Sequence, residues 1–246
     1  MLLACIMRIA SPTMARIPRK FILQDQSYFH VTWKCHNEEH LLQNPQVKQK
    51  LHDLLKAFKA KYRIKIFGYC FMDNHPHLVG YCETRQEFSR FFQVVNGQIA
   101  RFINRGLSRR GQVIMDRMRS PQIESDKHLL SVLRYVDLNP VRAGLCRHPQ
   151  NYRWSSYRAL ALGYKDPLLD PLPDFISLEP DGYLRLHAES PERNDQNELR
   201  FFSKCFFIGT PDWVRKRQAE LAKSLFLSKQ HASPPLPPSS YKENSR

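Results

Sequence analysis

Residues 63–82 read RIKIFGYCFMDNHPHLVGYC, two runs of β-branched and aromatic residues joined by a short polar turn. Each run has the length and composition of a β-strand, and a turn of this kind is typical of an antiparallel hairpin. The stretch therefore predicts one strand over 63–71 and a second over 75–82.

The same rules extend the prediction in both directions along the chain. Thr84 followed by Glu87 forms a capping box that begins a helix, and Pro140 is expected to end one. The order β-α-β-β-α-β predicts an α+β fold, a ferredoxin-like antiparallel sheet with helices on one face and the other face open to a ligand. The expected elements outside the hairpin are a strand over 28–35, a helix over 45–62, a helix over 84–104, a short strand over 113–115 and a helix over 126–139.

Composition predicts how the chain is divided. A single main domain takes up most of it, and the apolar run FFI, the turn GTP and a basic amphipathic helix follow as a small C-terminal appendage. The expected parts are a disordered extension at 1–13, the main domain at 14–160, an acidic proline-rich connector with little regular structure at 161–200, a strand–helix appendage at 201–227 and a disordered tail at 228–246.

The charge of the chain is large and unevenly distributed. The net charge is +15 and the pI is about 9.7. Residues 1–160 carry the whole +15, whereas 161–200 carry −5. Such a field attracts polyanions, and arginine suits phosphate, although a solvated basic surface remains the alternative for any one residue. The candidate DNA-binding residues are Arg101, Arg105, Arg109, Arg110, Arg117, Arg119, Arg134 and Arg142.

Six cysteines occur without close pairing, and no apolar run approaches the roughly 18 residues of a membrane span. We therefore expect reduced thiols, no membrane partner and a cytoplasmic, nucleoid-associated protein.

Two histidines, His75 and His77, stand two positions apart on the second strand of the hairpin. Side chains at this spacing point to the same face of a sheet, so both imidazoles can reach one metal ion. The alternative is a pair of surface histidines near a turn. Pro76 between them removes a ladder donor and suits an edge or a bulge.

A third candidate group lies on the helix predicted over 126–139. His128, Tyr135 and Asn139 fall together on the flank of its apolar stripe. The simpler interpretation of Tyr135 is a tyrosine at the core boundary, with a buried ring and a hydroxyl in water. Beside a metal-bound phosphate, the same oxygen can act as a nucleophile, and Asn139 can offer an oxygen to the ion.

These residues resemble a known family, the REP-associated tyrosine transposases within the single-tyrosine HUH transposases. The resemblance covers about residues 14–157, and its most specific part is YVDLNPVRAGL at 135–145. Two positions depart from the family pattern: Pro76 replaces a bulky aliphatic residue, and Asp73 replaces a proline. The other matching stretches are MARIPR at 14–19, YFHVT at 28–32, FMDNH at 71–75, HPH at 75–77 and WSSY at 154–157.

The resemblance implies a metal-dependent tyrosine DNA transposase and nuclease, with 14–160 as its catalytic domain. It would cleave and rejoin single-stranded DNA at hairpin (palindromic) repeats, as a monomer or homodimer, through a 5′-phosphotyrosine link to Tyr135. His75, His77 and Asn139 would hold Mg²⁺ or Mn²⁺.

Two alternatives stay open. One is a non-catalytic nucleic-acid-binding module or domesticated transposase relic, with Tyr28, Trp33 and Tyr81 as stacking platforms. The other is a metal-dependent hydrolase that activates water, in which Tyr135 is a bystander.

Overall fold

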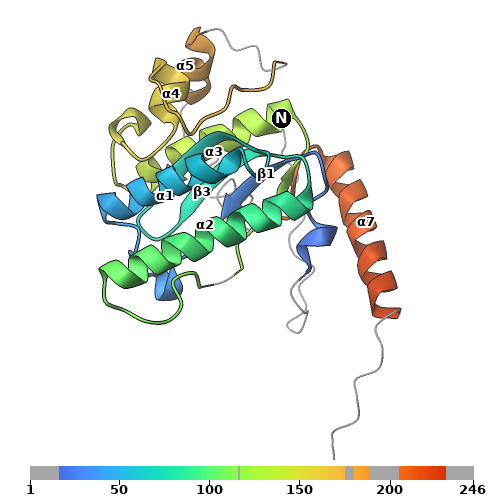
Figure 1. Ribbon diagram of the computed structural model, residues 1–246. Coiled ribbons are helices and arrows are strands. Elements are labelled where there is room, and N and C mark those ends of the chain that lie inside the picture. Colours follow the sequence, from blue (N-terminus) through green and yellow to red (C-terminus); the bar gives the residue numbers. More distant parts are fainter. Residues whose placement is uncertain (1–16, 116, 175–179, 189–204, 231–246) are drawn as a thin grey trace, which may run out of the picture.

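The structure is a computed structural model that describes residues 17–115, 117–174, 180–188 and 205–230 (Figure 1). A five-stranded sheet lies at its centre. The strands are β1 (Ser27–Thr32), β2 (Ile64–Phe71), β3 (Pro76–Cys82), β4 (Gln122–Ile123) and β5 (Phe207–Ile208). The helices are α1 (Pro45–Lys59), α2 (Arg85–Gly106), α3 (Asp126–Arg142), α4 (Tyr157–Leu162), α5 (Pro180–Ala188) and α7 (Pro211–Gln230), with 3-10 turns η1 (Arg19–Phe21), η2 (His36–Glu38) and η3 (Pro149–Asn151).

The strands are ordered β2-β3-β1-β4-β5 in the sheet. β4 and β5 are parallel, and the other neighbouring strands are antiparallel. The first four strands thus have the ferredoxin-like arrangement, which confirms the predicted α+β fold class. The strand expected over 113–115 is wrong, because only Ile114 forms an isolated bridge, to Cys35, and the fourth strand is β4. Two residues are too few for β4 to show an alternating pattern in the sequence.

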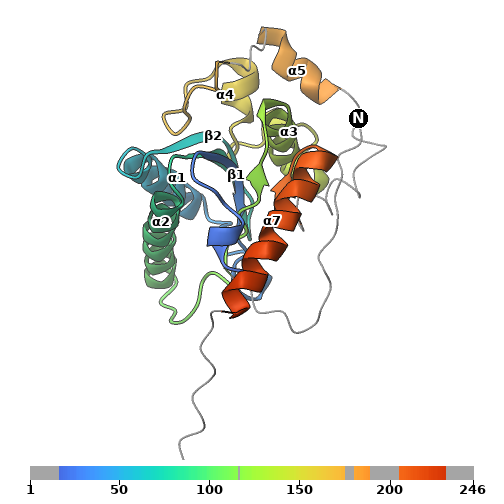
Figure 2. The ribbon, with the colours of Figure 1, turned by 90° about the vertical axis from the view of Figure 1, so that its right-hand side faces the viewer.

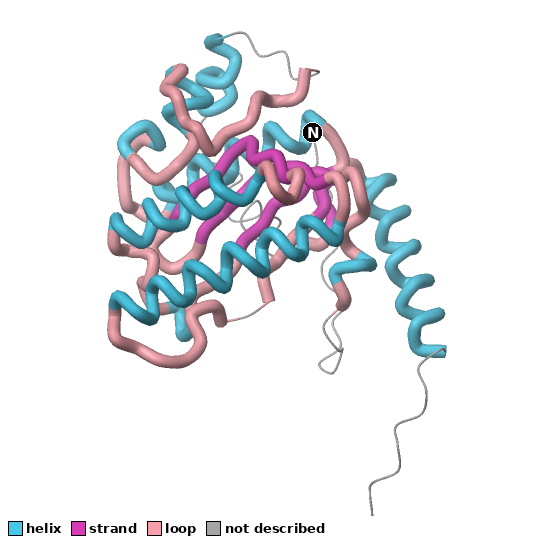
Figure 3. The backbone as a smooth tube through the Cα atoms, in the orientation of Figure 1, coloured by secondary structure: helices cyan, strands magenta, loops and turns pink. Residues whose placement is uncertain are grey.

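Alternation along the strands gives the sheet two different faces. Phe29 and Val31 pack with α1 and α2, whereas Val79 packs with Leu133 and Val136 of α3. Figure 2 shows α1 and α2 on one side of the sheet and α3 on the other, and Figure 3 shows the strands enclosed between them. The expectation of helices on one face holds for α1 and α2 only. The second face is not open, because the apolar stripe of α3 covers it.

Helix α3 continues through Pro140 to Arg142, so the predicted stop at Asn139 is wrong. Proline lacks an N–H, which deprives the Val136 carbonyl of its usual partner. The Asn139 side chain compensates, since its Nδ2 lies 3.4 Å from the Val136 carbonyl oxygen and 2.9 Å from that of Tyr135. The last turn of α3 is therefore stabilised by a side chain at the position before the proline.

A β-bulge divides β2. The pairing of β2 with β3 shifts by one residue between Ile66 and Gly68, so the consecutive residues Phe67 and Gly68 both face α3. Gly80 of β3 pairs with Ile66 at the edge of this bulge. A Cβ on Gly80 would lie 2.1 Å from the carbonyl oxygen of Lys65, so the close approach of the two strands requires glycine.

The segment after α3 returns to the sheet. The backbone N–H of Ser156 donates a hydrogen bond to the carbonyl of Tyr69, at the outer edge of β2, with a distance of 2.9 Å. The connector expected over 161–200 to have little regular structure contains α5, so that expectation is wrong for 180–188. Tyr183 of α5 packs on Tyr157 of α4. Such a short helix cannot be predicted from a proline-rich sequence, because its stability comes from contacts with the rest of the fold.

The predicted strand–helix appendage is present as β5 and α7. Phe207 pairs with Gln122 of β4, and Val214 and Leu221 of α7 pack with Ile22. The appendage therefore packs on the main sheet. Residues 228–230, which were expected to be disordered, belong to α7. The extension predicted at 1–13 and the tail beyond 230 lie outside the described residues.

Of the helices that the structure describes, none has the length and apolar character needed to cross a membrane. The described cysteines, Cys35, Cys70, Cys82, Cys146 and Cys205, are free thiols.

The bulge opposite Gly80 generates a stability prediction. Gly80→Ala should lower the free energy of unfolding by about 1–3 kcal/mol, because the new methyl group collides with backbone that cannot move without separating β2 from β3. Urea denaturation measures the change. Gly106→Ala is the matched control, since no described atom lies within 4 Å of a Cβ at that helical position. Equal losses in both variants would contradict the prediction.

Candidate active site

His75 and His77 lie at the beginning of β3. Their ring centroids are 4.9 Å apart and the ring planes are nearly perpendicular, at 76°. His77 is 4% exposed and lies two residues before Val79, so its side chain points to the face covered by α3. The structure thus brings the two predicted histidines into contact, on a covered face of the sheet.

A tight turn holds this pair in place. Lys48, which is buried, donates from Nζ to Oδ1 of Asp73 at 2.5 Å and so ties the turn to α1. Nδ1 of His75 lies 2.6 Å from Oδ1 of Asn74, a geometry in which the ring N–H donates to the amide oxygen. Pro76 is the first residue of β3, a position that tolerates a missing backbone N–H. Both departures from the family pattern are therefore accommodated locally.

Tyr135 of α3 faces the histidines. Its ring centroid lies 5.7 Å from that of His77, with nearly perpendicular planes. The side chain is only 4% exposed, so Tyr135 lies in the core and not at its boundary. Burial raises its pKa to about 12, and the Arg142 guanidinium acts in the opposite direction. The guanidinium carbon of Arg142 lies 5.3 Å from the Tyr135 ring centroid, which favours a cation–π contact.

Asn139 lies one turn after Tyr135 on the same helix and is 7% exposed. Its Nδ2 is committed to the carbonyls freed around Pro140. This fixes the orientation of the amide and directs Oδ1 away from those carbonyls. An amide held in this way can present its oxygen to a cation, which is the role predicted for it.

His30 of β1 is a site residue that the sequence analysis missed. Its Nε2 lies 2.9 Å from Nδ1 of His77, and the two rings are stacked with an interplanar angle of 11°. Its ring also meets Tyr135 edge-on, at 5.9 Å between centroids. The signal that could have found it is the pairing of His30 with Val79, which makes His77 its diagonal neighbour. That register depends on strand pairing and is not visible in β1 alone.

Burial keeps all three imidazoles neutral near pH 7. Desolvation, reinforced by the charge on His75, lowers the pKa of His30 to about 3. It lowers the pKa of His75 to about 4, where Lys34 adds to the effect, and it depresses the pKa of His77 well below its ordinary value. Neutral imidazole is the form that binds a metal.

The residues fit a metal ion of the oxygen-preferring kind. Nε2 of His77 is buried and has no hydrogen-bond partner among the described atoms, so its lone pair can serve as a ligand. The described residues hold no group of three His, Cys, Asp or Glu side chains suited to a metal. With His75 and His77, the further ligands would have to be an amide oxygen such as that of Asn139, waters or substrate oxygens.

Arg109, Arg134 and Arg142, three of the predicted DNA-binding arginines, are partly buried and make contacts within the protein. Nη1 of Arg109 lies 3.3 Å from Oε2 of Glu39. Nε of Arg134 donates to the Leu186 carbonyl of α5 at 2.7 Å, and Arg142 covers Tyr135. Arg109 and Arg134 therefore have structural roles, and Arg142 lies against the ring of Tyr135.

The other predicted arginines are solvent-exposed. The backbone of Arg119 pairs with Thr32, and Thr32 pairs on its other side with His77. The segment around Arg119 therefore runs near the histidine pair. The exposed members of the predicted set are Arg101, Arg105, Arg110, Arg117 and Arg119.

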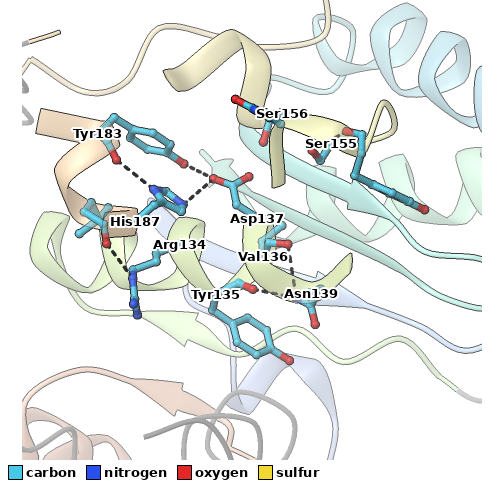
Figure 4. A network of polar contacts seen from close by, with 12 residues as sticks. Arg134, Tyr135, Val136, Asp137, Asn139, Ser155, Ser156, Tyr183 and His187 are labelled. Carbon is cyan, nitrogen blue, oxygen red and sulfur yellow. Dashed lines mark hydrogen bonds and ion pairs between the residues drawn. The ribbon is translucent and has the colours of Figure 1, made fainter. Parts of the chain in front are cut away.

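A buried polar network holds α3 from the side opposite Tyr135 (Figure 4). Asp137 is completely buried and accepts a hydrogen bond from the Tyr183 hydroxyl, at 2.5 Å. Nε2 of His187 lies 3.3 Å from the same carboxylate oxygen. Nδ1 of His187 lies 2.9 Å from the Tyr183 carbonyl, to which it must donate. Tyr183 and His187 of α5 therefore both approach the Asp137 carboxylate.

Comparison with known families finds a similarity over part of the chain. Residues 24–120 match the family described as "Transposase IS200 like". This segment, less than half of the chain, is thus similar to IS200-like transposases. The match ends before α3, so it does not include Tyr135 or Asn139.

Two solved structures are similar to the chain, and the first supports the fold. One is a REP-associated tyrosine transposase bound to a REP hairpin, with a TM-score of 0.50 and 17% identity, covering 64% of this chain and 92% of that one. Another is a putative transposase from Deinococcus radiodurans R1, with a TM-score of 0.35 and 13% identity, covering 53% of this chain and 96% of that one. The comparison with curated proteins found no match. The resemblance to REP-associated tyrosine transposases predicted from the sequence is confirmed by the family match and the first structure.

The network around Asp137 predicts that Tyr183 stabilises α3. Tyr183→Phe should cost about 1–3 kcal/mol of unfolding free energy, because a buried carboxylate loses its hydroxyl donor. Chemical denaturation measures the loss. Tyr164→Phe, at a tyrosine that is 64% exposed, is the control and should change stability by less than about 0.5 kcal/mol. If the two variants unfold alike, the hydroxyl does not contribute to holding α3.

Proposed function

We propose that the protein cleaves and rejoins single-stranded DNA through a 5′-phosphotyrosine link to Tyr135. The observation that carries this proposal is the placement of the Tyr135 ring 5.7 Å from that of His77, which also has His75 as a neighbour at 4.9 Å. A tyrosine beside two neutral imidazoles joins a nucleophile to a metal-binding pair. The structurally similar transposase bound to a REP hairpin supports hairpin DNA as the substrate.

In this proposal His75, His77 and the Oδ1 of Asn139 hold a divalent cation. Mg²⁺ or Mn²⁺ suits an open site of two imidazoles, an amide oxygen and waters, and the described residues add no group of three His, Cys, Asp or Glu side chains suited to a metal. His75, His77 and Asn139 would hold the cation, which would supply Lewis acidity toward a non-bridging phosphate oxygen. The protein contributes ligands already in the neutral form, so binding the ion releases no proton from them near pH 7.

Tyr135 carries the bond-making step. Its phenolic oxygen attacks phosphorus, a P–O bond to the tyrosine forms, and the bond from phosphorus to the 3′ oxygen breaks. The phenolic proton leaves, and the 3′ oxygen gains a proton to become a free hydroxyl. The reverse reaction rejoins the strand, so the covalent link conserves the phosphoester and no nucleotide cofactor is required. Arg142 assists by favouring the phenolate, whose formation burial opposes.

The exposed arginines form the proposed DNA-binding surface, since contacts with phosphates position a nucleic acid independently of its base sequence. Arg117 and Arg119 lie on the segment that runs beside Thr32 and therefore close to the histidine pair. We assign catalysis to residues 14–160. The segments at 180–188 and 205–230 support this domain, since α5 bonds α3 and β5 extends the sheet.

A second candidate function is a binding module that holds nucleic acid without cutting it. The observation that favours it is the burial of Tyr135, which is only 4% exposed and so offers a phosphate little access. A hydrolase that activates water is a third possibility, in which Tyr135 is dispensable. The two experiments below separate these functions.

The nucleophile is tested by trapping a covalent adduct. A single-stranded hairpin substrate should yield a denaturation-resistant protein–DNA adduct, joined to the 5′ side of the break, that mass spectrometry places on Tyr135. Tyr135→Phe removes one oxygen, so it should abolish the adduct while changing DNA affinity by no more than about 1.5 kcal/mol. Tyr164→Phe should retain the adduct. Cleavage by Tyr135→Phe at the parent rate would exclude the phosphotyrosine mechanism.

The cation is tested by its removal. Chelating divalent ions should stop cleavage, and Mn²⁺ or Mg²⁺ should restore it. His77→Ala should reduce activity by on the order of a hundredfold or more with the fold intact. His148→Ala, an exposed histidine beside Tyr157, should cleave like the parent. Full activity in EDTA would eliminate the metal from the mechanism.

A further inference from the structure

His30 is the one buried imidazole of the site with no role in the mechanism above. It approaches His77 through a nitrogen–nitrogen contact of 2.9 Å, short enough that one nitrogen must carry a proton and donate it to the other. The remaining nitrogens, Nδ1 of His30 and Nε2 of His77, are buried without hydrogen-bond partners among the described atoms. The contact therefore links the protonation sites of the two rings.

Only two neutral arrangements satisfy this contact. In the first, Nδ1–H of His77 donates to Nε2 of His30, which leaves Nε2 of His77 with a free lone pair. In the second, Nε2–H of His30 donates to Nδ1 of His77, which puts the His77 proton on Nε2. A nitrogen that carries a proton cannot be a metal ligand, so only the first arrangement makes His77 a ligand.

We propose that His30 is a positioning residue for His77. Its Nε2 accepts the Nδ1–H of His77, and this hydrogen bond keeps Nε2 of His77 unprotonated and fixes the direction of its lone pair toward a divalent cation. The inference rests on the proposed function, because it takes the cation as the ligand of His77. A carbonyl or carboxylate usually performs this task for metal-bound histidines, and here an imidazole whose plane is within 11° of that of His77 performs it.

Simple packing is the competing explanation for His30. Its ring is 1% exposed and touches both His77 and Tyr135, so it fills space whether or not it accepts a hydrogen bond. Two substitutions separate these roles. His30→Phe keeps an aromatic ring but removes the acceptor, whereas His30→Gln can place an amide oxygen near the position of Nε2.

The experiment measures Mn²⁺ binding to the full chain by calorimetry, without DNA. His30→Phe should weaken Mn²⁺ binding about 10–100-fold, and His30→Gln should recover most of the loss. His52→Phe is the matched control, because His52 also loses a ring hydrogen bond, to Asp166 at 3.0 Å, but packs by Tyr69 on the other face of the sheet. It should bind Mn²⁺ with the affinity of the parent. Thermal unfolding shows that each variant is folded.

A second measurement needs no variant at position 30. In ¹⁵N-histidine-labelled parent protein saturated with Mg²⁺, long-range ¹H–¹⁵N spectra should show His77 as the Nδ1–H tautomer, with its signals assigned through His77→Gln. An Nε2–H tautomer would overturn the proposal, as would parent-like Mn²⁺ affinity in His30→Phe or equal weakening in His30→Phe and His30→Gln. Absence of Mn²⁺ binding by the parent would also overturn it. Failure of the phosphotyrosine mechanism appears separately, as a missing adduct with these metal results unchanged.

Discussion

The packing of α3 against the sheet determines where each part of the candidate site lies. Val132, Leu133 and Val136 of this helix are fully buried against Phe67 and Val79, and burying each such side chain contributes about 1.5–3 kcal/mol. This contact covers the face that carries the histidines, and it turns Tyr135 toward them. Because Asp137 and Arg134 bind α5 on other sides of the helix, α3 is held by polar contacts as well as by its apolar stripe.

Burial of the site has opposite effects on its two halves. For His75 and His77 it favours the neutral imidazole, the form that ligates a metal. For Tyr135 it disfavours the phenolate, the form that attacks. The same desolvation therefore favours the metal-binding form of the two histidines and disfavours the attacking form of Tyr135. Arg142 lies where it partly offsets the second effect, and a bound cation and substrate would add to that offset.

The sequence predicted those features that depend on local patterns. The hairpin and the capped helix at Thr84 follow from composition and spacing, and so does the convergence of His75 and His77. Features that depend on contacts between distant segments were missed or misplaced. His30 becomes a neighbour of His77 only through strand register, and the course of α3 through Pro140 depends on how the Asn139 side chain bonds the backbone. Tyr135 was placed near the core edge because a helical wheel does not include the sheet that buries it.

The parallel pairing of β5 with β4 has a consequence for the timing of folding. β4 ends at Ile123 and β5 begins at Phe207, so 83 residues must be synthesised between them. At about 5–20 residues per second, the outer edge of β4 stays unpaired for about 4–17 s on the ribosome. Unpaired strand edges attract other chains, and short edges do so less. A strand of only two residues therefore limits how much unpaired backbone the growing chain exposes to other chains before its last strand arrives.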